Sequence, residues 1–551
     1  MTNRPRGLRD GCGSQFITSQ TSSSGMRLLL LSFFLSASTF AQPIQTRYSE
    51  VRLHITGRAE LADLAHVGVA IDHPIVTETA TGYDVDVVLN AWEVERLQSS
   101  SIAYDVLVED LAASFAERPG VTPERRAELE RAGGLEHFTY GTMAGFLRFE
   151  ELVTELDSMR MLFPHLASAR ISLGQTHEGR DIWMVKISDN PDLEEGEPEA
   201  LYTAIHHARE PQSMMTVVYF MWYLLENYGV DPQVTSLVDT RELYFVPMIN
   251  PDGYVYNETT DPDGGGLWRK NRRDNQDGSF GVDPNRNYGY LWGLDDIGSS
   301  PNPSSGTYRG PAPFSEPENQ AIRDFLESRS FGTAANFHSR GEEYLYPWTH
   351  ATATYTPDDA LFNTTSADMA FENGYEYGTA ADVLYPVNGS SDDWMYGEQA
   401  SKPKILAWTP EVCNRTTDGF WPPLERIIPI AQENIRANLI LAELAGSEPV
   451  AEEPGVAEPP SFLSSAFPNP FEGSTSIRLS LAEATRVSFD VVDVLGRTVY
   501  TESSLSRLAV LHTFTWNGRD SNGQDAAPGL YILRFQTNDG RTQSRRVIKV
   551  D

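Results

Sequence analysis

Apolar runs that alternate with helical patterns over residues 137–445 constrain the fold of this chain more than any other feature. Strand-like runs occur at 200–205, 242–247, 333–337 and 405–408, and helical stretches at 213–228 and 429–445. This alternation favours a sheet whose strands run largely parallel, with helices packed on its faces. We therefore predict an α/β domain over these residues.

The beginning of the chain predicts export. Met26-Arg27 precedes an apolar run at 28–35, and small residues follow up to Ala41. A charged start, a short apolar stretch and a small-residue cleavage site are typical of a secretory signal peptide, so we assign 1–41 to a signal peptide with a polar extension. The run is too short to span a bilayer, and no later stretch approaches the roughly 20 apolar residues of a membrane helix. We expect a secreted or cell-surface protein without a membrane span.

Residues 42–130 form a second predicted unit. Strand-like alternation at 51–55 and 83–89 is combined with helical patterns around 61–66 and 92–97, which indicates a small α+β domain. The charged stretch Glu124–Arg131 is interpreted as part of a connector to the α/β domain.

The last part of the chain differs in composition. Residues 446–460 are rich in Pro and Glu, as expected of a solvated linker. Strand patterns follow at 476–481, 486–494, 510–516 and 530–536, separated by turn signals. Short strands with this spacing predict a β-sandwich over 461–551.

Charge and cysteine content exclude several kinds of site. The 43 Lys and Arg residues against 77 Asp and Glu give a net charge of -34, which excludes nucleic-acid binding through a basic surface. Only 5 of those cations are Lys, so the composition fits adaptation to high salt and an ordinary acidic secreted protein about equally. Cys12 and Cys413 cannot make a disulfide framework or a four-Cys zinc site. A metal would need His and carboxylate ligands, and Cys413 is predicted to be a buried apolar filler.

Acidic and imidazole side chains follow three of the predicted strands. His207 and Glu210 come after the first run with HxxE spacing, His338 follows a later strand, and Glu411 follows the last one. Imidazole nitrogen and carboxylate oxygen are zinc donors, and a catalytic site needs three protein ligands plus an open position. Strands of an open α/β sheet bring such residues together at their carboxyl ends. The pattern predicts a metal-dependent active site.

The sequence resembles the zinc metallocarboxypeptidases of the carboxypeptidase A and B family. The matching motifs occur in the family's order at 178–180, 207–210, 250–253, 268–270, 281–287, 314–318, 337–339, 385, 391–394, 411 and 427–433. The resemblance implies the family's mixed, largely parallel sheet over 137–445. It also implies one Zn²⁺ per catalytic domain, held by His207, Glu210 and His338.

The same resemblance implies the remaining site residues. Glu411 corresponds to the general base and acid, and Arg269 to the arginine that stabilises the oxyanion. The clamp for the substrate's terminal carboxylate corresponds to Asn285, Arg286 and Tyr385, with Arg209 as an auxiliary cation. Asp392 falls where basic-specific members carry an aspartate at the floor of the side-chain pocket, which implies a preference for C-terminal Arg or Lys. His206 breaks the motif spacing and is left out of the ligand set.

The flanking domains carry weaker resemblances. Residues 42–130 resemble the inhibitory propeptide of this family, removed by proteolysis within 118–131; a retained accessory domain is the alternative. The C-terminal segment resembles the sorting domains of type IX secretion, on the motifs at 467–471, 491–497, 516–520, 529–531 and 545–549. This resemblance implies secretion machinery as a partner. The alternative is that the C-terminal segment is a generic immunoglobulin-like binding module.

Together these observations predict a secreted zinc metallocarboxypeptidase zymogen that acts on peptides and proteins with free C-termini. One alternative is a hydrolase of peptidoglycan peptides, or of other amides, on the same fold. A second alternative is a catalytically inactive, peptide-binding surface module.

Overall fold

The computed structural model of the chain describes residues 47–446 apart from 58–59, 61–62, 66–67 and 119, and then 462–463, 471–480, 485–493, 497–507, 511–537 and 542–550. The predicted signal peptide and residues 447–460 of the predicted linker lie outside these residues. Within them, no helix is both long and apolar enough to cross a membrane.

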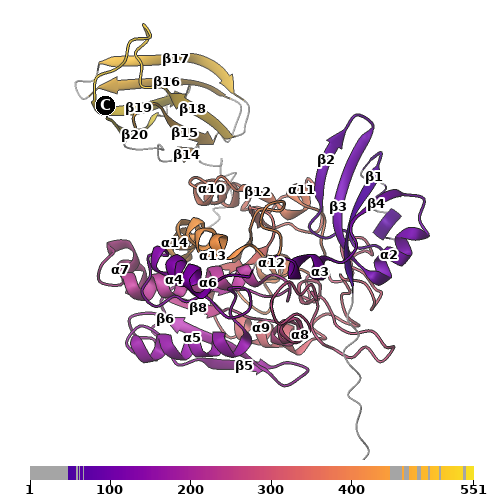
Figure 1. Ribbon diagram of the computed structural model, residues 1–551. Helices are drawn as coiled ribbons and strands as arrows, with labels where there is room; N and C mark the ends of the chain where they lie inside the picture. Colours follow the sequence, from indigo (N-terminus) through magenta and orange to yellow (C-terminus); the bar gives the residue numbers. More distant parts are fainter. Residues whose placement is uncertain are drawn as a thin grey trace, which may run out of the picture. The chain divides into compact units, whose positions relative to one another are not determined.

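A mixed sheet forms the centre of the α/β domain (Figure 1). Its strand order is β12-β11-β13-β9-β7-β8-β6-β5, with the short β10 paired to β13. The strands are β5 (Ile171–Gln175), β6 (Asp181–Ile187), β7 (Glu199–Thr203), β8 (Glu242–Val246), β9 (Phe331–Asn336), β10 (His338–Ser339), β11 (Glu343–Tyr346), β12 (Glu376–Thr379) and β13 (Leu406–Val412). The neighbours β13, β9, β7 and β8 are all parallel, whereas β6, β5 and β11 introduce antiparallel pairs. The predicted α/β class with a largely parallel centre is confirmed.

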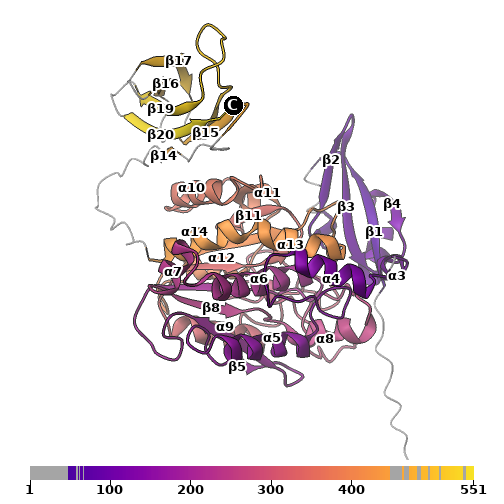
Figure 2. The same cartoon turned by 60° about the vertical axis from the view of Figure 1, so that its left-hand side comes forward.

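Helices cover both faces of this sheet. They are α5 (Phe149–Leu162), α6 (Pro211–Asn227), α7 (Pro232–Val238), α8 (Pro251–Thr260), the 3₁₀ turn η1 (Pro284–Arg286), α9 (Pro317–Glu327), α10 (Asp359–Met369), α11 (Ala380–Val383), α12 (Ser391–Gly397), α13 (Leu424–Glu433) and α14 (Ile435–Ala445). Figure 2 shows α6, α13 and α14 on one side of β8 and α9 on the other. Side chains along each strand alternate between the two faces, and β6, β7, β8, β9 and β13 contribute buried residues to a core on each face.

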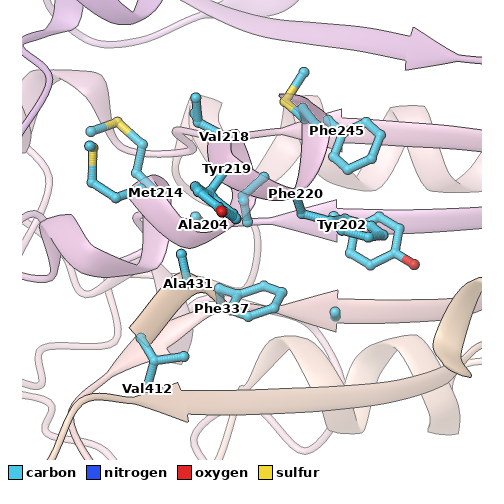
Figure 3. Close-up of a cluster of buried hydrophobic side chains, with 14 of the residues drawn as sticks. Tyr202, Ala204, Met214, Val218, Tyr219, Phe220, Phe245, Phe337, Val412 and Ala431 are labelled. Carbon is cyan, nitrogen blue, oxygen red and sulfur yellow. The ribbon is translucent and has the colours of Figure 1, made fainter. Parts of the chain in front are cut away.

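The larger core lies under α6, α13 and α14. Tyr202 of β7 stacks on Phe245 of β8, with ring centroids 5.0 Å apart, and Phe220 of α6 packs on Tyr202 at 5.3 Å (Figure 3). Phe337, which precedes His338, and Val412, which follows Glu411, belong to the same buried cluster. The residues that flank the predicted site are therefore anchored by apolar burial.

The N-terminal unit contains a sheet of order β2-β3-β1-β4. Its elements are β1 (Tyr48–Ile55), β2 (Ile75–Thr79), β3 (Gly82–Asn90), α2 (Ala91–Gln98), β4 (Ala103–Val108), α3 (Leu111–Ala116) and α4 (Pro123–Ala132). The predicted strands at 51–55 and 83–89 and the predicted helix at 92–97 match β1, β3 and α2, whereas the predicted helix at 61–66 lies partly outside the described residues. The charged connector, however, is helical over Pro123–Ala132, because Thr122 caps the helix and Pro123 stands at its first position.

The C-terminal part is built from two antiparallel sheets, of order β14-β15-β18 and β17-β16-β19-β20. The strands are β14 (Phe462–Leu463), β15 (Thr475–Ser480), β16 (Thr485–Asp493), β17 (Thr498–Arg507), β18 (Leu511–Trp516), β19 (Gly529–Thr537) and β20 (Thr542–Lys549). Residues of both sheets share one buried cluster, among them Ile477, Phe489 and Trp516, as a β-sandwich requires. β14, β17 and β20 were missing from the predicted set: β14 has only two residues, and the sequences of β17 and β20 are polar and rich in Ser, Thr and Arg.

The closing helix also differs from its prediction. The stretch 429–445 is not one helix but the end of α13 followed by α14, with the break at Asn434. Asn434 is buried, and its side-chain amide bonds to the hydroxyls of Tyr344 and Tyr375 and to the Ile430 carbonyl. Because tertiary contacts stabilise this break in the helix, the apolar pattern of residues 429–445 does not reveal it.

Candidate active site

The predicted zinc ligands and Glu411 lie at the carboxyl ends of adjacent parallel strands. His207 follows β7, and His338 follows β9 as the first residue of β10. In the parallel pairing of β10 with β13, His338 lies directly opposite Glu411. Glu210 is the N-cap residue of α6, and Pro211 at the first helical position ends the turn after β7.

His207, Glu210 and His338 converge on one point. The Nδ1 atom of His207 lies 2.7 Å from Glu210 Oε1, and the Nδ1 atom of His338 lies 2.9 Å from Glu210 Oε2. The two Nδ1 atoms are 3.0 Å apart, so two ring nitrogens and a carboxylate face a common centre. These three residues are buried and could hold a metal ion. Their donor set fits zinc.

The contacts behind these ligands favour metal binding as well. His207 Nε2 lies 3.1 Å from Asp283 Oδ1, which leaves Nδ1 free to face the centre. Burial, together with the nearby Arg269 guanidinium, lowers the pKa of His207 and so favours its neutral imidazole, whereas Glu210 raises the pKa of His338 in spite of its burial. No role was predicted for Asp283, although it lies within the quoted motif 281–287.

The predicted substrate-binding cations surround one carboxylate, that of Asp72 in the N-terminal unit. Arg209 and Arg269 both donate to Asp72 Oδ2, the latter at 2.8 Å. The hydroxyl of Tyr385 donates to Asp72 Oδ1 at 2.6 Å, and the nearest guanidinium nitrogen of Arg286 is 3.9 Å away. The structure thus brings four predicted substrate-binding or oxyanion residues to one anionic group.

The next residue, His73, contacts Glu411. Its Nε2 atom lies 3.2 Å from both carboxylate oxygens of Glu411, and both side chains are buried. Burial alone would lower the pKa of His73, but the carboxylates of Asp72 and Glu411 raise it to about 9. Burial would raise the pKa of Asp72, yet Arg269 and His73 hold it well below its usual range. No motif marks Asp72 or His73, so the sequence pattern could not identify them.

The two remaining predicted substrate-binding residues are Asn285 and Asp392. Asn285 Nδ2 lies 3.3 Å from His338 Nε2, and Asn285 Oδ1 accepts from the Ser391 backbone at 2.9 Å. Asp392 is 2 % exposed and accepts from Asn336 Nδ2 at 2.7 Å and from Thr409 Oγ1 at 2.6 Å. Burial raises its pKa to about 6, against the lowering effect of these two hydrogen bonds.

His206 and Cys413 behave as predicted. His206 is buried outside the ligand group, stacks on His338 with centroids 5.2 Å apart, and lies 2.9 Å from the Tyr288 hydroxyl. Cys413 is fully buried in the larger apolar cluster.

A buried His-Glu-His centre beside the Glu411 carboxylate and several guanidinium groups is the arrangement of a metal-dependent hydrolase site. The zinc carboxypeptidase family model matches residues 152–437 of this chain. A zinc carboxypeptidase of Saccharothrix mutabilis subsp. capreolus is 33% identical over 303 residues, 52% of this chain and 67% of the relative. Zinc carboxypeptidase A 1 of Anopheles gambiae is 30% identical over 434 residues, 76% of this chain and 94% of the relative.

Solved structures share the fold. The carboxypeptidase A of Helicoverpa armigera has a TM-score of 0.58 at 21% identity, covering 73% of this chain and 98% of that one. Thrombin activatable fibrinolysis inhibitor has a TM-score of 0.55 at 22% identity, covering 73% and 99%.

The chain belongs to the zinc carboxypeptidase family, and it is a zinc-dependent metallocarboxypeptidase. The prediction of a peptide-bond hydrolase that uses zinc is confirmed at this level. In the C-terminal part, residues 465–541 match the FlgD Ig-like domain model, which agrees with a β-sandwich and does not identify a sorting domain.

We expect the His207→Ala variant to lose one equivalent of zinc per chain together with peptidase activity, because it removes one of three protein ligands. His206→Gln is the matched control, since it alters the adjacent imidazole outside the ligand group. Metal analysis of both variants after dialysis measures the difference. Equal zinc loss in both variants would contradict the ligand assignment.

Proposed function

We propose that this zinc carboxypeptidase removes the C-terminal residue of peptides and proteins, with water as the nucleophile and Glu411 as the general base. One observation carries the proposal: Arg209, Arg269 and Tyr385 hold a carboxylate, that of Asp72, beside the His-Glu-His centre. A site built to hold an anion next to the reacting groups suits a substrate that ends in a free carboxylate.

Each predicted residue has a physically suitable task in this proposal. Zinc held by His207, Glu210 and His338 would supply Lewis acidity and lower the pKa of water. Glu411, 4 % exposed and opposite His338, would accept the proton of the attacking water and pass it to the leaving amine. Arg269 would stabilise negative charge on the scissile carbonyl oxygen, because its guanidinium is always charged.

The terminal carboxylate would be bound by the remaining cations. Arg286 is buried, its side chain donates to the Asn285 carbonyl, and its Nε has no hydrogen-bond partner in the described part of the chain. A guanidinium with free donors can grip a carboxylate through two parallel hydrogen bonds. Asn285, Tyr385 and Arg209 would complete this clamp.

Glu411→Gln should lower kcat/KM of the enzyme without its N-terminal unit by about 10²–10⁴-fold, because the amide cannot accept a proton. Zinc content should stay at the wild-type value, since Glu411 is not a ligand. Peptide hydrolysis and metal analysis on the same samples test both statements. Near wild-type turnover would rule out Glu411 as the base.

We further propose that residues 42–130 act as an inhibitory propeptide. This is supported by Asp72, which occupies the cations needed for a substrate carboxylate, and by His73, which contacts Glu411. The stretch 120–122 before α4 is exposed and not helical, and α4 has no buried residue, as expected of a segment that proteases cut. Cleavage within 118–131 would then release the site.

Full-length Asp72→Asn should be at least ~10-fold more active than full-length wild type, because breaking a buried ion pair costs about 3–5 kcal/mol. Asp105→Asn is the control: it lies in the same unit, is largely exposed, and should leave inhibition intact. Trypsin-treated wild type gives the activity of the released enzyme. If intact and trimmed wild-type proteins hydrolyse a blocked dipeptide equally well, the unit does not inhibit.

A preference for C-terminal Arg or Lys is the finer part of the proposal, and it rests on Asp392. A buried carboxylate with only neutral hydrogen-bond donors retains an unbalanced charge, which a cationic side chain would compensate. Broader acceptance of apolar residues is compatible with the same pocket, because burial already favours the neutral form of Asp392 near pH 6.

Asp392→Ala should cost a substrate ending in Arg about 2–5 kcal/mol of transition-state binding and affect one ending in Leu much less. Asp392→Asn keeps the volume and isolates the effect of charge. Values of kcat/KM for Arg, Leu and Glu substrates measure the preference. If kcat/KM falls equally for the substrates ending in Arg and in Leu, Asp392 does not select the C-terminal side chain.

Export is the last element of the proposal. It is supported by the signal-like sequence at 1–41 and by a C-terminal β-sandwich, which would engage secretion machinery.

A further inference from the structure

A second His-Glu-Glu group lies outside the active site. His177 stands in the turn after β5, Glu316 is the N-cap residue of α9, and Glu318 is the second residue of that helix. One ligand atom from each lies within 4.8 Å of the other two. His177 Nε2 and Glu316 Oε2 are 2.8 Å apart, close to the separations of 2.7 Å, 2.9 Å and 3.0 Å within the catalytic group.

The two carboxylates of this group are fully buried and face each other. Glu316 and Glu318 are both 0% exposed, and the single amide of Asn271 donates to both, at 2.8 Å and 3.1 Å. Oε1 of Glu318 is buried and has no hydrogen-bond partner in the described part of the chain. Two buried carboxylates side by side with an unused acceptor are costly unless a positive group lies between them.

The protein side chains supply only part of that positive charge. Arg273 and the Ser315 hydroxyl both donate to the other oxygen of Glu316, Oε1, and not to Oε2, which lies next to His177. A cation bound between the two carboxylates would supply the rest.

We propose that His177, Glu316 and Glu318 form a second zinc site. One imidazole nitrogen with two carboxylate oxygens suits zinc, whereas calcium prefers an all-oxygen shell. The His177 side chain is 28% exposed, so an ion can enter from solvent and water can complete its coordination. This site is independent of the proposed function.

The position of the site indicates a structural role. It would join the turn after β5 to the start of α9 and to the segment that contains Asn271. Asn271 pairs with Val282 through its backbone and its side chain, at 3.0 Å and 2.7 Å, directly before Asp283. An ion bound there stabilises the folded state and not the unfolded chain, so its removal should lower the melting temperature.

The test is the zinc content of the full-length protein after loading with Zn²⁺ and dialysis. We expect two equivalents in wild type, one in His177→Ala, one in Glu318→Gln, one in His207→Ala, and none in the His177→Ala/His207→Ala double variant. Glu178→Gln is the matched control: this residue is a neighbouring glutamate, 44% exposed, that pairs with Arg180, and the variant should retain two.

Thermal unfolding with Zn²⁺ and with EDTA gives a second readout. Zinc should raise the melting temperature of His207→Ala, which retains the second site, and should not raise that of the double variant. One equivalent in both wild type and Glu318→Gln would overturn the proposal, because Glu318 would then be a protonated buried acid. Two equivalents in His177→Ala, or filling of the site by Ca²⁺ but not by Zn²⁺, would also overturn it.

Discussion

The register of the parallel strands is the constraint on which the rest of the site depends. β7 pairs with β9, and β9 with β13, so the three strands end at the same edge of the sheet. The pairing of His338 with Glu411 then fixes a prospective ligand and a prospective base side by side. Because Phe337 and Val412 are buried next to them, a shift of either strand would expose core side chains as well as disperse the site.

Charge balance is the second constraint, and it links the active site to the N-terminal unit. Arg209, Arg269 and Arg286 are buried together, which is unfavourable without anions. Asp283 pairs with Arg269 from within the catalytic domain, and Asp72 supplies the other carboxylate from outside it. Asp72 of the N-terminal unit thus adds negative charge to this cluster, and in the proposed function a substrate carboxylate would take its place.

Much of this arrangement could be predicted from the sequence. The sheet and its ligands have local signatures: apolar runs give the strands, and HxxE places His207 and Glu210 at the end of one of them. Asp72 and His73 have no such signature, because their partners lie more than a hundred residues away and no spacing rule connects them. The break at Asn434 was not predicted for a related reason, because a buried amide network decides it. The helix of the connector does have a local signal, the Thr122-Pro123 cap, but it has no apolar periodicity, on which the prediction of helices relied.

The geometry also bears on how release from the N-terminal unit would work. A substrate carboxylate and Asp72 need the same guanidinium groups, so their binding is mutually exclusive and substrate competes with the docked unit. The competition is unequal while the chain is intact, because Asp72 is tethered and present at a high effective concentration, whereas a peptide must bind from solution. In the proposed activation, cutting within 118–131 would remove that advantage without changing a residue of the site, so an exposed connector would control a buried active site.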